Sequence, residues 1–205
     1  MTPEPHFTGD LAAVPTHAFG HRSLTWWGVI AYMAIEGAFF VLAAAAYFFL
    51  MNQEASWAPG RIRPPELLAG TLFTLVMLAS EIPNSIVKKA AESHRLRTVQ
   101  VGLLVVAAFG LVLLALRAFE FGSLNVRWTD NPYGSVLWML LVLHTVHVST
   151  DWVDTLVLTA LMFTPQMHEP RRLVDTSENS LYWRFVWLTW LPLYLLIYWL
   201  PRWSP

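Results

Sequence analysis

The sequence has no cysteine and few charged residues, and each of these absences excludes classes of protein. Without cysteine the chain forms no disulfide and provides no thiolate for an iron–sulfur cluster or a thiolate-ligated copper centre. Charged residues make up 13% of the 205 residues, against about 25% in a typical soluble domain. The 13 Lys and Arg are matched by 14 Asp and Glu, which leaves no basic surplus for a phosphate backbone. We therefore expect neither a soluble globular protein nor a nucleic-acid partner.

Long apolar segments dominate what the sequence does contain, since 56% of the residues are hydrophobic. About 20 apolar residues cross a hydrocarbon core of roughly 30 Å as a helix, which pairs its own backbone polar groups. Segments of this kind lie at about residues 26–51, 65–87, 99–119, 134–163 and 183–200. The sequence thus predicts an all-α, polytopic membrane helix bundle with five transmembrane helices.

The remaining residues predict a single domain with a defined orientation. Residues 1–21 have neither the basic start nor the apolar core of a cleavable signal peptide. We expect a mobile, retained N-terminal tail there, followed by one domain over residues 22–205. With five spans, the N-terminal side of the membrane carries more Lys and Arg than the other side. This distribution predicts a cytoplasmic N-terminus and an external C-terminus.

Three glutamates within or at the ends of the spans are candidates for function, because an ionisable group in a membrane is costly. Glu36 lies near the middle of the first span among aromatic and apolar neighbours, which favour the uncharged acid. A proton-exchanging or headgroup-binding carboxyl and a neutral packing glutamate are equal alternatives for it. Glu81 is expected in a structural ion pair or as a solvated carboxylate. Glu120 follows Arg117 by three residues, which indicates a local interfacial pair.

The fourth span carries a polar stripe made of His144, His147, Asp151 and Asp154. At 100° per residue these side chains fall within an arc of about 80°, so they face another helix, a partner subunit or water. Two His three residues apart resemble metal ligands, but two His on one face cannot bind a haem iron from opposite sides. A di-iron bundle site needs Glu followed three residues later by His, a spacing that is absent from the sequence. We expect a hydrogen-bonded packing network and no metal site.

Four segments, taken in order, form a recognisable pattern: WWGVIAYMAIEGAFF at 26–40, ALRAFEF at 115–121, NPYGSVLWMLLVLHTVHV at 131–148 and YWRFVWLTWLPLYLLIYW at 182–199. They resemble subunit III of the haem–copper cytochrome c oxidases over roughly residues 23–203. Glu36 matches the family's membrane-buried Glu and Glu120 its aromatic-flanked Glu. His144 and His147 match its H-x-x-H-V signature.

The chain also departs from the pattern of that family. Thr145 replaces a glycine of the span-four signature, and Arg184 and Trp187 stand where the last helix commonly has His and Asp. Arg184 is therefore a further polar candidate beside the glutamates and the stripe. Typical members have seven spans, and this chain resembles the shorter, five-span bacterial members.

The resemblance implies an accessory subunit in the cytoplasmic membrane of a bacterium, acting in aerobic respiratory electron transport. It would hold no haem, copper or other cofactor itself and would not be catalytic alone, since haem and copper belong to partner subunits. It would pack against catalytic subunit I and other oxidase subunits, bind phospholipid from the membrane and support proton uptake. Two alternatives stay open, an accessory subunit of a nitric oxide reductase and a self-standing proton-coupled transporter that uses Glu36 and the stripe.

Overall fold

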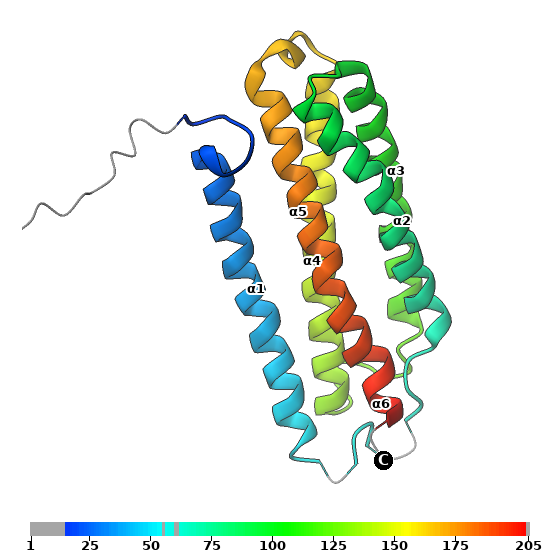
Figure 1. Ribbon diagram of the computed structural model, residues 1–205. Coiled ribbons are helices and arrows are strands. Elements are labelled where there is room, and N and C mark those ends of the chain that lie inside the picture. The colour runs from blue at the N-terminus through cyan, green and yellow to red at the C-terminus, as the bar shows by residue number, and fades with distance from the viewer. Residues whose placement is uncertain (1–14, 55, 60–61, 204–205) are drawn as a thin grey trace, which may run out of the picture.

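Five long helices run up and down in the computed structural model, which describes residues 15–54, 56–59 and 62–203 (Figure 1). They are α1 (Leu24–Met51), α2 (Leu67–Glu92), α3 (Leu96–Gly122), α4 (Pro132–Met162) and α5 (Pro170–Tyr194). Shorter turns are η2 (Gly20–Arg22), η3 (Pro165–His168), the π-helical η4 (Leu195–Trp199) and α6 (Leu200–Trp203). Strands are absent from the described ranges, and the predicted all-α class is confirmed.

Four of the helices, α1 to α4, are long and apolar enough to cross a membrane, so the protein is a membrane protein. The fifth helix begins well before the predicted fifth span. Pro170 occupies its first turn, where a missing N–H and a fixed φ are favourable, so the polar residues that follow are helical as well. The helix continues through η4 and α6 to Trp203, and the wider π turn comes soon after Pro192, which lacks a backbone donor.

The start of α1 is fixed by hydrogen bonds to the segment before it. The Ser23 hydroxyl accepts from the backbone N–H of Thr25 at 3.2 Å and so caps the helix. The same hydroxyl and that of Thr25 donate to the carbonyl of Thr16, at 2.9 and 2.7 Å. Residues 1–14, most of the predicted N-terminal tail, lie outside the described residues.

The helices are arranged in layers, with α4 and α5 between α1 on one side and α2 and α3 on the other (Figure 1). Helix α1 packs mainly against α4 and α5. Only 17% of its most apolar 18-residue stretch is buried, against 44% of the corresponding stretch of α4. Polar side chains of α4 and α5 therefore meet a well-packed neighbour on one side and a lightly packed helix on the other.

In the described residues the apolar core consists of two clusters. The larger surrounds Phe73, Leu137 and Trp190, and the smaller surrounds Leu103 and Met162 near the loops that follow α2 and α4. Both clusters fill the space between the same helices that carry the buried polar residues described below. Those polar residues are consequently held by close-packed neighbours, which limit their rotamers.

Candidate functional site

The Arg117 group joins α3, α4 and the end of the fifth helix. The guanidinium of Arg117 donates through Nη1 to Glu120 Oε2 at 2.6 Å and through Nη2 to His144 Nδ1 at 2.8 Å. The Tyr198 hydroxyl donates to the second carboxylate oxygen, Glu120 Oε1. Arg117 is 2% exposed and Glu120 is fully buried, so the predicted interfacial pair lies inside the protein. The guanidinium also stacks 3.7 Å above the Phe73 ring, a favourable cation–π arrangement.

The hydrogen bonds of His144 determine its tautomer. A guanidinium only donates, so Nδ1 is the acceptor and carries no proton. Nε2 then carries the proton and donates to the carbonyl of Val186 at 3.0 Å. Both ring nitrogens are engaged, which leaves His144 no lone pair for a metal. Within the described part of the chain, no group of three His, Cys, Asp or Glu side chains is placed to hold a metal ion.

The Glu36 group joins α1, α4 and α5. The Tyr182 hydroxyl donates to Glu36 Oε2 at 2.5 Å, and His147 Nε2 lies 3.3 Å from Glu36 Oε1. His147 Nδ1 is 2.6 Å from the carbonyl of Leu143, which only accepts, so Nδ1 carries a proton. The contact between Nε2 and Oε1 therefore contains either an imidazolium beside a carboxylate or a neutral ring beside a protonated acid. Glu36 and His147 can therefore share one proton, and both residues are 7% exposed.

The Asp151 group holds two carboxylates side by side. The amide of Asn179 donates through Nδ2 to Asp151 Oδ1 at 2.9 Å and to Asp154 Oδ2 at 3.2 Å. Its carbonyl oxygen accepts from the Thr155 hydroxyl at 3.2 Å. Asp151 is buried, whereas Asp154 is exposed. Both line a pocket of about 240 Å³ that also includes Tyr182, so this group adjoins the Glu36 group.

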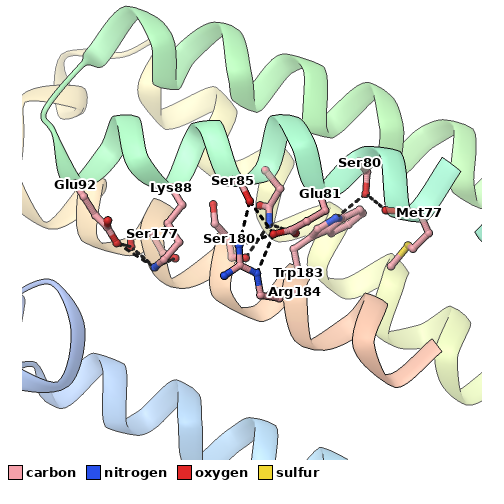
Figure 2. A network of polar contacts seen from close by, with 11 residues as sticks. Met77, Ser80, Glu81, Ser85, Lys88, Glu92, Ser177, Ser180, Trp183 and Arg184 are labelled. Carbon is pink, nitrogen blue, oxygen red and sulfur yellow. Dashed lines mark hydrogen bonds and ion pairs between the residues drawn. The ribbon is translucent and has the colours of Figure 1, made fainter. Parts of the chain in front are cut away.

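The Glu81 group connects α2 with α5 and is shown in Figure 2. Arg184 donates to Glu81 Oε1 from Nε at 2.8 Å and also from Nη2, and Ser85 donates to the same oxygen at 2.8 Å. Lys88, further along α2, pairs instead with Glu92 at 3.1 Å. The side chains of Arg184 and Glu81 are 38% and 19% exposed. This is a half-buried structural ion pair across two helices.

The structure brings the candidates together in pairs. Three pairs join different helices: Glu36 with His147, Glu81 with Arg184, and Glu120 with His144 through Arg117. The fourth pair, Asp151 and Asp154, lies on α4 and is bridged by Asn179 of α5. The stripe on α4 thus faces helices of this chain, and its four members contact three different groups. Asp154 alone among them lies at an exposed position.

Sequence reasoning missed several residues that complete these groups, namely Tyr182, Tyr198 and Asn179, and it did not assign Arg117 a role of its own. Asn179 and Tyr182 lie three residues apart, which places them on one face of a helix. That signal could be recognised only by extending the fifth helix back through its polar N-terminal half.

Comparisons with known proteins agree on one family. A sequence model described as "Cytochrome c oxidase subunit III" matches residues 10–204. Subunit 3 of cytochrome c oxidase from Synechocystis sp. is 26% identical over 183 residues, which cover 87% of this chain and 77% of that protein. The same subunit from Thermostichus vulcanus is 23% identical over 189 residues, 91% of this chain and 92% of that protein. The one from Rhizopus stolonifer is 25% identical over 193 residues, 89% and 66% respectively.

Proposed function

Because the chain belongs to the cytochrome c oxidase subunit III family, we propose that it acts as an accessory, cofactor-free subunit of a haem–copper oxidase. It packs against the catalytic subunit, and the haem and copper belong to partner subunits. The match over residues 10–204 supports this role along nearly the whole chain. The hydrogen bonds at both nitrogens of His144 support it too, because they leave this ligand candidate of the fourth span unable to bind a metal.

The contact of 3.3 Å between His147 Nε2 and Glu36 Oε1 is the observation that carries the rest of the proposal. A carboxyl and an imidazole in contact can exchange a proton without leaving a bare buried charge, since either partner can hold it. Tyr182 holds Glu36 in place from α5. We propose that this pair supports proton uptake by the catalytic subunit, either by exchanging protons itself or by tuning the field at the interface.

Phospholipid binding is supported by an apolar groove of about 360 Å³ between α1 and the fifth helix. Val41 and Ala44 line one wall, and Leu188 and Leu196 line the other. A groove of this kind suits an acyl chain, which needs apolar contact and no hydrogen bonds. The lightly packed face of α1 leaves room for chains of neighbouring lipids as well.

The proposed location is the bacterial cytoplasmic membrane, with the N-terminus inside. The loop after α2 and the loop before α5 lie at the end of the bundle where α1 begins (Figure 1). Those loops and the helix turns beside them contain Lys89, Arg95, Arg97, Arg171 and Arg172. Short loops rich in Lys and Arg stay on the cytoplasmic side.

Purification of the tagged chain from its native membrane in a mild detergent tests the proposed role. We expect a larger polypeptide to co-purify in a fixed ratio, with haem absorbance and oxygen-reducing activity in the same fraction. A Glu36→Gln chain should retain the partner and the haem while its complex takes up protons more slowly. Co-purification with a nitric oxide reductase, or a stable chain that transports a solute without any partner, would contradict the proposal.

A further inference from the structure

Arg184 has a hydrogen-bond donor that the chain itself does not use. Its Nε and Nη2 donate to Glu81, and Nη2 also donates to Ser85 at 3.0 Å, whereas Nη1 has no acceptor among the described residues (Figure 2). The protein does not enclose this nitrogen, since every buried nitrogen of Arg184 has a partner and the side chain is 38% exposed. One donor of the guanidinium is therefore open to whatever lies outside the bundle.

This donor lies near the middle of the membrane. Glu81 is the fifteenth of the 26 residues of α2. Arg184 is 14 residues from Pro170 and 19 from Trp203, the two ends of the continuous helix formed by α5, η4 and α6. At 1.5 Å per residue, both charged residues lie within about 5 Å of the middle of their helices. In a hydrocarbon core of about 30 Å centred on the bundle, they are about 10 Å from either headgroup layer.

The charges around Arg184 are already balanced within the chain. Glu81 pairs with Arg184, and Lys88, further along α2, pairs with Glu92. These two pairs have no net charge, so a carboxylate brought in from outside would become a buried, unbalanced anion. A neutral oxygen from a hydroxyl, a side-chain amide or a backbone carbonyl satisfies the open donor without that cost.

The depth and the chemistry of the donor select one kind of occupant. Acyl chains have no acceptor, and the ester and phosphate oxygens of a phospholipid lie about 10 Å away in the headgroup layers. A second copy of the chain related by a two-fold axis would place one guanidinium against another. A helix of a different subunit can present an acceptor at this depth, because its backbone is paired internally and its Ser, Thr, Asn or Gln side chains project outwards.

We propose that the surface between α2 and α5 around Arg184 docks a transmembrane helix of a partner subunit, which presents a neutral oxygen to Arg184 Nη1. This surface, the Arg184 face, consists of Leu78, Glu81, Ser85, Leu181 and Arg184. Leu78 is 40% exposed one turn before Glu81, and the partly exposed Leu181 lies one turn before Arg184. The two leucines provide apolar contact beside the polar one, a combination that holds helices together in membranes.

The inference rests on the proposed function, because it names the face by which the accessory subunit joins its complex. Photo-cross-linking in native membranes tests it, with p-benzoylphenylalanine introduced singly in place of Leu78 or of Leu111. Leu111 is the matched control, since it is a mid-depth leucine of α3 and is 58% exposed. We expect position 78 to form an adduct that peptide mapping assigns to a transmembrane helix of the co-purifying polypeptide, and position 111 to form lipid adducts with little or no protein adduct. Lipid adducts alone at position 78, a cross-linked dimer of the chain, or equal protein adducts at both positions would overturn the docking face.

A pair of substitutions tests the donor itself. Arg184→Met should lower the amount of partner polypeptide that co-purifies in detergent by about tenfold or more. Arg97→Met, which removes an exposed arginine from the first turn of α3, should leave that amount unchanged. Leu78→Trp obstructs the face without touching the ion pair, so it serves as a second test should Arg184→Met fold poorly, with Leu111→Trp as its control.

Full retention of the partner by both Arg184→Met and Leu78→Trp would contradict the docking face. Haem absorbance in the wild-type preparation reports on the proposed function separately. If haem were absent while the adduct at position 78 persisted, the oxidase role would be wrong and the docking face would stand. If haem were present and position 78 gave only lipid adducts, the oxidase role would stand and the docking face would be wrong.

Discussion

The Arg117 group and the Glu36 group use the same three side-chain types and differ by one cation. Each contains a buried glutamate, a histidine of α4 and a tyrosine of the fifth helix that donates to the glutamate. In the first group Arg117 supplies a fixed positive charge. It stabilises Glu120 as a carboxylate and fixes the neutral tautomer of His144 that carries its proton on Nε2. In the second group the basic partner of Glu36 is His147, which is charged only if it is protonated.

The helices around the two groups explain the difference in what each can do. Arg117 and Glu120 come from α3, which packs closely against α2 and α4, and they are almost completely removed from solvent. Glu36 comes from α1, whose most apolar stretch is less buried than that of α2, α3 or α4. A fixed charge pair in a close-packed site suits a structural role. A movable proton beside a lightly packed helix suits exchange.

The largest expected effect of this difference is in chemical reactivity. A hydrophobic carbodiimide, which reacts with protonated carboxyls that it reaches through lipid, should label Glu36 and leave Glu120 unlabelled. Glu120 is fully buried, so the reagent cannot reach it. It accepts hydrogen bonds from both Arg117 and Tyr198, which stabilise it as a carboxylate. Peptide mapping of wild type and Glu36→Gln would show this, and equal labelling in the two proteins would remove Glu36 as the reactive site.

Removing the cation from the Arg117 group should have the largest effect on stability. Arg117→Met leaves the Glu120 carboxylate buried without its ion pair, which typically costs about 3–5 kcal/mol in unfolding free energy. Unfolding in a denaturing detergent, followed by circular dichroism, measures this loss. The double variant Arg117→Met with Glu120→Leu should recover much of it, because no charge then remains unpaired. A loss below about 1 kcal/mol for the single variant would show that the pair is solvated after all.

The two tyrosines offer a matched test of smaller size. Tyr198→Phe removes a donor from a carboxylate held as an anion by Arg117, and about 1.5–3 kcal/mol of stability should be lost. Tyr182→Phe removes the equivalent donor from Glu36, where a proton shared with His147 can satisfy the carboxyl instead. Its cost should be about 1 kcal/mol or less. The same unfolding measurement compares the two, and a larger loss for Tyr182→Phe would mean that Glu36 is held as a fixed anion too.

The helices could be predicted from sequence because the length of an apolar segment is a local property. The four predicted spans up to residue 163 correspond to α1, α2, α3 and α4 with ends that differ by a few residues. The start of α5 could not be predicted in this way, because polar residues from Arg171 to Ser180 continue the helix without adding hydropathy. Their helical state follows from Pro170 and from contacts with α2 and α4.

The partners of the candidate residues were harder to predict, because they depend on how each helix is rotated about its axis. Helices α1 and α3 are apolar around most of their circumference, so the sequence alone shows little about which of their faces is inside. The polar stripe of α4 shows which face is inside, but not which residues of other helices it meets. The contact of Glu36 with His147 and that of Glu81 with Arg184 join residues more than 100 positions apart. Only the local pair of Arg117 and Glu120 was accessible from spacing, and its burial was not.

The smallest expected effect concerns the Glu81 group, which has a fixed cation like the Arg117 group but lies closer to the surface. Glu81→Gln should cost about 1 kcal/mol or less, because the side chains of Arg184 and Glu81 are 38% and 19% exposed and water screens their attraction. The cost should shrink further when salt is raised, whereas the effect of Arg117→Met should change little. Unfolding at low and high ionic strength measures both, with Glu92→Gln as the control for the exposed pair with Lys88. If Glu81→Gln instead lost as much unfolding free energy as Arg117→Met, and lost it at every salt concentration, the Glu81–Arg184 pair would be shielded from water. It would then be a fixed, buried ion pair like that of Arg117 and Glu120.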